Sequence, residues 1–369
     1  MPSHTPTVAR RFVPALLLAL TLTACGAPVA PAPTAAPAAS NAASVDLSGI
    51  KTYLVGKTDD LKAASADLKA ISDRYYDMAK AANFDYAALA KDKHDDLVTS
   101  VNDARAVWTK ASPLYEQMEG IVAGTPSLAQ FDVDLDAGSS KADGGDNVVS
   151  FDLKLPDGRV LEQPGNLFGV TESTLWGTFA DYRVKDVTLD FDGDGKQGFG
   201  DTMPDANVLK GGVDELAAQS AKLADSAAAW QPTEADAFTA LVVMVPTMSE
   251  YFDSWKNSRF IAGDKSNQRD FVAISRLADI QNILGSLQIV HQNVSPLIQS
   301  ADANEDAQIG KGLTDLKSFI ADVYQKEQRG QRFSAEDADL LGKEAQDRAT
   351  AITGQITQVA AKLNIKIEE

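Results

Sequence analysis

The segment LDFDGDGKQGFGD, residues 189–201, places carboxylates at alternate positions among glycines. Like-charged carboxylates this close repel one another unless water or a cation lies between them, and glycine lets the backbone turn its carbonyls toward the same point. The order Asp-x-Asp-x-Asp-Gly is typical of a calcium-binding loop, which takes its ligands from loop positions 1, 3, 5, 7 and 12. Here those positions are held by Asp190, Asp192, Asp194, Lys196 through its carbonyl, and Asp201.

Two departures from the calcium-loop pattern predict a modest affinity. Asp201 replaces the longer glutamate of position 12, and Gln197 stands where an apolar residue normally joins the core. Extracellular calcium modules work at about 10⁻⁴ to 10⁻³ M, so a weak site would still fill outside the cytoplasm. A solvated Asp/Gly turn without an ion is the alternative. If calcium binds, we expect its role to be structural.

The N-terminus predicts export and lipid anchoring. Arg10 and Arg11 precede the apolar run FVPALLLALTLTA, which is the layout of a signal peptide over residues 1–24. The residues LTAC resemble the lipobox of bacterial lipoproteins, and this places a lipid on Cys25, the only cysteine. Acyl chains contribute about 0.8 kcal/mol per buried methylene, so two or three of them hold a domain firmly on a membrane. We therefore expect a membrane-anchored lipoprotein of the cell envelope, facing the periplasm or the outside.

Composition divides the mature chain into a tether and a folded domain. Residues 25–45 are rich in alanine and proline and too poor in large apolar side chains to form a core. The folded domain is predicted over residues 46–369. Its longest uncharged apolar stretch, FTALVVMVP, is far shorter than the roughly 20 residues that span a bilayer.

The charge of the chain argues against nucleic acid as a partner. The formal net charge is -18, and loss of the two signal-peptide arginines leaves 32 basic residues against 52 acidic ones, a charge of -20. Such a surface repels nucleic acid and anionic lipid headgroups. It suits cations, or it is simply a solvated exterior.

Apolar periodicity predicts an all-α fold. Leu54, Leu61, Leu68 and Tyr75 recur every seven residues on one face of a long amphipathic helix over residues 46–81. Similar patterns cover residues 85–123, 206–229, 234–261, 268–299, 304–327 and 334–364. Short links between long helices favour antiparallel neighbours, so we expect an up-and-down helical bundle of two similar halves.

Three local signals refine this prediction. Pro246 should kink its helix, and Ser334 should cap the last one. Residues 131–205 break the helical pattern. There, VVSFDLKLPDGRVLEQ alternates apolar and polar residues around Pro-Asp-Gly, which indicates a β-hairpin. A short helix, TESTLWGTFADY, and the acidic loop follow, so we interpret 131–205 as an irregular insertion and not as a separate domain.

The residues do not support a conventional hydrolase. After signal cleavage only His94 and His291 remain, and neither lies in a His-Glu-x-x-His pattern. The chain has no Gly-x-Ser-x-Gly elbow and no phosphate-binding loop. We expect His94 to face solvent on a helix and His291 to lie on the apolar face of another, although either could be a ligand.

The segment NLFGVTESTLWG resembles the imelysin-like family, bacterial envelope proteins that include the lipoprotein of ferrous-iron uptake systems. The family pattern is Gly-x-His-x-x-Glu followed by an apolar run ending in Trp-Gly. Glu172 and the Leu-Trp-Gly of residues 175–177 match it, whereas Gly169 stands in place of the histidine. Upstream, ASPLYEQMEGI resembles a family helix through Tyr115 and Glu119. The resemblance covers residues 46–364. It is to the type of family member that has no cupredoxin domain.

The resemblance implies a metal site that has lost one ligand. An imidazole and a carboxylate one helical turn apart can hold the same ion, and without the imidazole only oxygen donors remain. The candidates are Glu172, Glu119 and Asp134 or its neighbour Asp136. An all-oxygen set suits calcium, magnesium or ferric iron better than zinc. In the alternative, the site is extinct and Glu172 only caps its helix.

Two hypotheses for function follow. In the first, the chain is a metal-binding accessory of iron uptake, with an iron permease or another envelope protein as partner. In the second, it is a non-catalytic binding or scaffold lipoprotein with a structural calcium site. The family name carries a peptidase activity, but the residues offer no set of nucleophile, base and metal ligands to support one.

Overall fold

The computed structural model describes residues 45–145 and 147–368, which form one compact unit dominated by helices. The signal peptide, Cys25 and nearly all of the predicted tether lie outside the described residues. No helix in the described ranges is long and apolar enough to cross a membrane. The all-α prediction is confirmed, with two small antiparallel sheets as the only strands in these ranges.

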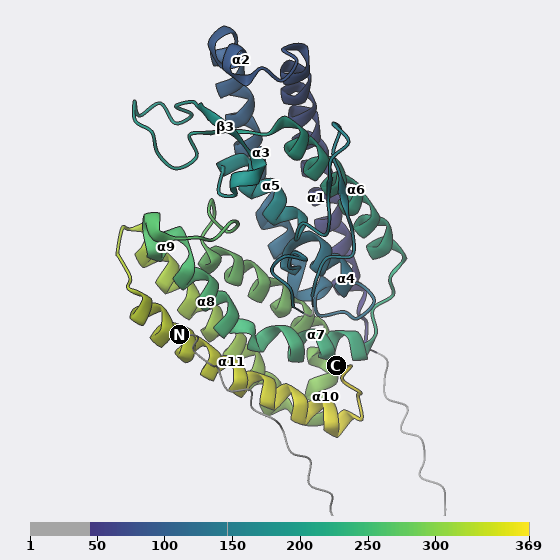
Figure 1. Cartoon of the computed structure of the whole chain (residues 1–369). Helices are drawn as coiled ribbons and strands as arrows, with labels where there is room; N and C mark the ends of the chain where they lie inside the picture. The colour runs from purple at the N-terminus through teal and green to yellow at the C-terminus, as the bar shows by residue number, and fades with distance from the viewer. Residues whose placement is uncertain (1–44, 146, 369) are drawn as a thin grey trace, which may run out of the picture. The chain divides into compact units, whose positions relative to one another are not determined.

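The first half of the bundle is built on three long helices (Figure 1, purple to teal). Helix α1 (Ser48–Ala81) packs against both α3 (His94–Val122) and α6 (Ala206–Ala229), and the short α2 (Tyr86–Asp92) links α1 to α3. The predicted seven-residue face of α1 is the buried one, since Leu54, Leu61, Leu68 and Tyr75 are each at most 1% exposed. Periodicity therefore identified the contact surface of this helix correctly.

The second half contains α7 (Glu234–Met244), α8 (Met248–Asn257), α10 (Arg276–Gln328) and α11 (Ala335–Leu363) (Figure 1, green to yellow). Pro246 lies in the short turn η3 (Val245–Thr247) that separates α7 from α8, as predicted. The cap at Ser334 is also present, because its hydroxyl accepts the backbone N–H of Asp337 at 3.1 Å. Helix α9 (Arg259–Ala262) and turn η4 (Gly263–Lys265) follow α8.

Helix α10 is a hairpin of two antiparallel arms. Asp302 interrupts it with extended backbone (φ -163°, ψ 102°), and the side chain of Asp302 accepts the N–H groups that begin the second arm. Gln288 on the first arm contacts Thr314 and Lys317 on the second. The two helices predicted at 268–299 and 304–327 are these arms, although the first begins at Arg276. Helix α10 also packs against α3 and so joins the two halves.

The predicted insertion contains the β-hairpin. Strand β1 (Leu153–Lys154) pairs antiparallel with β2 (Val160–Leu161) around the expected turn, in which Gly158 takes a positive φ of 90°. Before the hairpin come α4 (Ala129–Asp132) and the π-helix η1 (Val133–Ala137). After it come α5 (Leu167–Trp176), turn η2 (Ala180–Tyr182), and strands β3 (Arg183–Thr188) and β4 (Thr202–Pro204), which flank the acidic loop.

Helix α5 is a core element of the insertion, not a decoration on its surface. It packs against α6, α3 and η1, and nearly all of its residues are buried. Gly177 ends it in the left-handed conformation (φ 68°), and a Cβ at Gly177 would collide with the side chain of Thr202. The Trp-Gly of the sequence pattern therefore marks a helix end that requires glycine.

Candidate metal centre

Three buried carboxylates from two elements converge between the halves. Glu116 and Glu119 are three residues apart and so share one face of α3, and Asp136 projects from the π-helix η1. One carboxylate oxygen from each lies within 4.8 Å of the others. We call Glu116, Glu119 and Asp136 the acid cluster. Its members are 0%, 3% and 1% exposed.

Arg276, the first residue of α10, is the cation that faces the acid cluster. Its guanidinium donates a 3.1 Å hydrogen bond to Asp279, one helical turn further along α10. It also lies 3.7 Å from a carboxylate oxygen of Glu116 and 4.0 Å from one of Asp136. The ring of Phe271 lies 3.5 Å beneath it, which fixes its plane. The single positive charge of Arg276 thus lies within 4.0 Å of carboxylate oxygens from three buried acids.

Two tyrosines donate hydrogen bonds to carboxylates of this site. Tyr251 donates a 2.6 Å hydrogen bond to Glu119, and Tyr115 donates one of 2.7 Å to the neighbouring Asp132. Both oxygens of Glu116, both of Asp136 and the second oxygen of Glu119 have no hydrogen-bond partner within the described part of the chain. Unpaired buried carboxylate oxygens are costly, so this cluster requires protons or a further cation.

Burial changes the titration of these acids. It raises the pKa of Glu116 and of Asp136 well above the usual range, and the neighbouring carboxylates raise both further while Arg276 lowers them. Burial likewise raises the pKa of Asp132 to about 7 and that of Asp279 to about 6. The site holds more acid than Arg276 alone can keep ionised at neutral pH.

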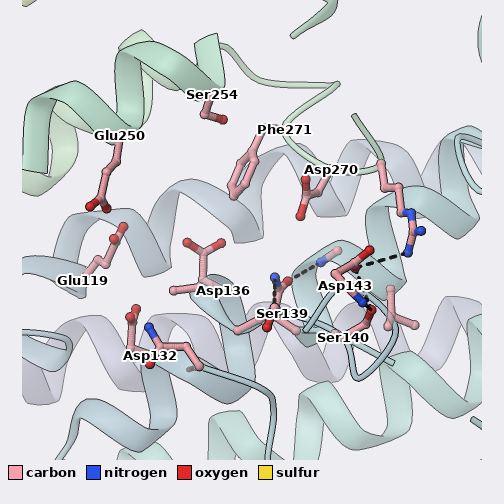
Figure 2. Close-up of a pocket in the computed structure, with 18 of the residues that line it drawn as sticks. Glu119, Asp132, Asp136, Ser139, Ser140, Asp143, Glu250, Ser254, Asp270 and Phe271 are labelled. Carbon is pink, nitrogen blue, oxygen red and sulfur yellow. Dashed lines mark hydrogen bonds and ion pairs between the residues drawn. The ribbon is translucent and has the colours of Figure 1, made fainter. Parts of the chain in front are cut away.

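Glu119 and Asp136 of the acid cluster border a cavity of about 510 Å³. Glu119, Asp132 and Asp136 lie at one end of it, and Ser139, Ser140 and Asp143 lie at the other (Figure 2). The cavity is therefore much larger than a bare ion requires. It leaves space for a ligand beside Glu119 and Asp136.

Gly169, where the family pattern has histidine, lies on the wall of this cavity. A Cβ built on Gly169 would lie 3.0 Å from a carboxylate oxygen of Asp270. Burial raises the pKa of Asp270 above its ordinary value. A side chain at position 169 would therefore contact Asp270, a further acid that the sequence pattern did not reveal.

Glu172 lies outside the acid cluster. Its carboxylate, 4% exposed, accepts hydrogen bonds from the consecutive backbone N–H groups of Phe271, Val272 and Ala273, at 2.9, 3.1 and 2.8 Å. Burial raises the pKa of Glu172 to about 7, although the three N–H donors act in the opposite direction. Glu172 therefore fixes the position of the segment that contains Asp270 and Phe271. Both carboxylate oxygens of Glu172 are used in these hydrogen bonds.

Asp134 also lies outside the acid cluster. It accepts hydrogen bonds from the backbone N–H and hydroxyl of Ser150 and from the amide of Gln130. Of the three residues predicted as metal ligands, Glu119 alone belongs to the acid cluster. The partners that sequence reasoning missed are Glu116, Arg276 and Asp279, and Asp136 entered only as a second choice.

The acidic loop brings three of its four aspartates together. Ligand oxygens of Asp190, Asp192 and Asp194 lie within 4.8 Å of one another. Asp190 also accepts the N–H groups of residues 193–195, and the φ of Gly195 is 75°. Asp201 is 2% exposed and instead accepts the N–H groups of residues 191 and 198. Lys196 donates its N–H to Asp194.

The two histidines lie apart from both groups of carboxylates. His94 is exposed at the start of α3, with its Nδ1 3.0 Å from Asp95. His291 is buried between the arms of α10, 3.1 Å from Asp306, and burial lowers its pKa. Neither belongs to a metal-binding group among the described residues.

Comparison with known proteins identifies the family. A family model described as Imelysin matches residues 49–363. The chain belongs to the imelysin family. Among solved structures, an imelysin-like protein from Psychrobacter arcticum 273-4 is similar to this imelysin at 15% sequence identity and a TM-score of 0.42, covering 88% of this chain and 99% of that one. None of the curated proteins matches this imelysin.

Proposed function

We propose that this imelysin is a cell-envelope lipoprotein that binds a metal cation at the acid cluster, as an accessory of iron uptake. The observation that carries the proposal is the convergence of Glu116, Glu119 and Asp136 with unpartnered buried oxygens. A cation among these oxygens would replace the missing hydrogen bonds and balance charge that Arg276 leaves uncompensated.

The donor set favours a hard cation. Carboxylate and phenol oxygens suit calcium, manganese, magnesium and ferric iron, whereas zinc and copper prefer imidazole and thiolate. No histidine or cysteine lines the cavity among the described residues. We infer that iron is carried as cargo, and that Arg276 lowers the affinity enough for release.

The same residues favour binding over catalysis. Peptide hydrolysis by a metal enzyme needs an ion held at an open position, with a base beside the attacking water. A carboxylate could act as that base, but those of the acid cluster would be the ligands themselves. Of the other buried carboxyls here, Asp132 accepts a hydrogen bond from Tyr115, and Asp279 accepts one from Arg276. We infer a non-catalytic site.

The envelope location rests on the LTAC segment. Lipidation of Cys25 would hold the domain at a membrane, where an iron permease or another envelope protein could receive the metal. Mass spectrometry of the envelope fraction should find an acylated N-terminus at Cys25. A Cys25→Ser protein that still sediments entirely with membranes would refute the anchor.

A second candidate function is a scaffold lipoprotein with a structural calcium site. The convergence of Asp190, Asp192 and Asp194 on the β3–β4 loop favours it. Metal analysis of the untagged protein, purified without chelator, separates the two proposals. Transition metal lost on Glu119→Gln with Asp136→Asn supports iron handling, whereas calcium alone, lost on Asp192→Asn with Asp194→Asn, supports the scaffold.

A further inference from the structure

A second cavity lies away from the acid cluster and has a different lining. It is a cleft of about 780 Å³ bordered by the end of α5, the residues just before β4, α9, and the link between α10 and α11. Its volume is within the range of about 300 to 1,000 Å³ that small-molecule sites occupy. We call it the arginine cleft, after Arg259 and Arg332 on its wall.

Arg259 presents a guanidinium that makes one long ion pair and no hydrogen bond within the described residues. Its Cζ atom lies 3.3 Å from the centre of the Phe199 ring, so the ring supports the charged group. Its nearest carboxylate, Asp264, is 4.0 Å away and fully exposed. Among the described residues no acceptor takes a hydrogen bond from this guanidinium within normal distance. Donors of this planar group thus remain available to a ligand.

Arg332 adds a second cation from the α10–α11 link. It is exposed and forms no ion pair or hydrogen bond within the described ranges. On this cleft, Arg332 thus has no described partner, and Arg259 has only the 4.0 Å contact with Asp264.

The remaining lining suits the body of an organic ligand. Trp176 and Phe260, both half-buried, contribute aromatic surface beside Phe199. The one inner carboxyl, Glu327, accepts a 2.6 Å hydrogen bond from the indole of Trp255, and burial raises its pKa. The arginine cleft is thus lined by three aromatic rings and two guanidiniums, together with the carboxyls of Asp264 and Glu327.

We propose that the arginine cleft binds a small organic anion, with carboxylates paired to Arg259 and Arg332 and a planar apolar part against the aromatic side chains. Guanidinium forks pair bidentately with carboxylates, and such charge-assisted bonds are roughly twice as strong as neutral ones. The proposal does not depend on metal binding, because the acid cluster contributes no residue to this cleft.

The probe is isophthalate, a planar aromatic dicarboxylate, titrated by calorimetry into the mature protein, with isophthalamide as the uncharged ligand of the same shape. We expect isophthalate to bind with a Kd of about 1 mM or tighter, and isophthalamide to show no binding. Arg332→Gln and Arg259→Gln should each weaken isophthalate about tenfold. Arg332 is exposed, so its variant should fold normally.

Arg348→Gln is the matched control, because it removes the same charge from an arginine that is paired with Glu344 outside the cleft. It should bind isophthalate within about twofold of the parent, since surface charges far from a site are screened. Three results would each overturn the proposal: a parent that does not bind isophthalate, equal binding of isophthalamide, or an Arg332→Gln protein that binds like the Arg348→Gln control.

Discussion

The carboxylate of Glu172 on α5 accepts a 2.8 Å hydrogen bond from the backbone N–H of Ala273, 101 positions later in the chain. Together with the bonds from Phe271 and Val272, it anchors the segment before α10 to the first half of the bundle. Phe271 has a φ of 52°, a left-handed conformation that few side chains adopt without such support. Glu172, the residue of the family pattern that this chain retains, is thus placed to shape the cavity wall.

Glu172→Ala should therefore destabilise the protein. Three backbone N–H groups, one buried and two part-buried, would lose their acceptor, and an unsatisfied buried donor costs about 1 to 3 kcal/mol. We expect a loss of at least about 2 kcal/mol in urea unfolding. Glu172→Gln, which keeps one accepting oxygen, should lose less. A Glu172→Ala protein with the parent's midpoint would contradict this role.

Stability without metal should decline as pH rises from about 4 to about 7. The pKa of Asp132 is raised from 3.8 to about 7, and that of Asp279 from 3.8 to about 6, so between about pH 4 and pH 7 the folded state holds protons that the unfolded state has lost. Stability then falls with pH, by about 1.4 kcal/mol for each unit of pKa shift. The stabilisation is fully present below pH 4 and lost above pH 7.

Urea midpoints of chelator-treated protein at pH 5 and pH 8 measure this dependence. We expect a lower midpoint at pH 8, and a smaller difference between the two values in Asp132→Asn, which cannot ionise at that position. A midpoint that rises from pH 5 to pH 8 would show that the buried acids are compensated in some other way.

Calcium should bind at the acidic loop and raise the melting temperature. A ligand at 100 times its Kd adds about 2.7 kcal/mol to the folded state. Asp192→Asn combined with Asp194→Asn should abolish the increase, whereas Asp59→Asn with Asp60→Asn, two exposed acids on α1, should preserve it. Equal melting temperatures in millimolar calcium and in chelator would reject the site.

Gly169→His should add a nitrogen donor to the cavity. The new Cβ would lie 3.0 Å from the Asp270 side chain, which must move by a few tenths of an ångström. We expect tighter binding of zinc, because imidazole suits that ion. Titration calorimetry of the variant against the parent measures the change, and an unchanged zinc affinity would show that position 169 does not reach the metal.

Sequence periodicity was sufficient for the fold because it reports local geometry. The positions of the α10 arms, the break at Pro246 and the cap at Ser334 depend on residues within a few positions of one another. The exception was α5. Its sequence was interpreted as part of an irregular insertion, although its apolar residues are buried in the core. Its neighbours α3 and α6 are distant in sequence, so no local signal could reveal that packing.

The site was harder to predict because its members come from distant segments. A signal for Asp136 was present: in a helical segment, Asp132 and Asp136 are four residues apart and share a face, whereas Asp134 points elsewhere. Glu116 and Glu119 carried the same kind of signal on α3. Arg276 reaches the cluster only through the packing of α10 against α3, which no spacing in the sequence reports.

The most direct test of the central claim is a calorimetric titration of manganese, a hard divalent probe, into protein whose acidic loop is disabled by Asp192→Asn and Asp194→Asn. On that background the account predicts one site, lost when Glu119→Gln and Asp136→Asn are added. It should be retained in Asp134→Asn, a matched change at a buried acid outside the acid cluster. Absence of binding in the loop-disabled parent, or undiminished binding after Glu119→Gln and Asp136→Asn, would contradict a metal centre at this position.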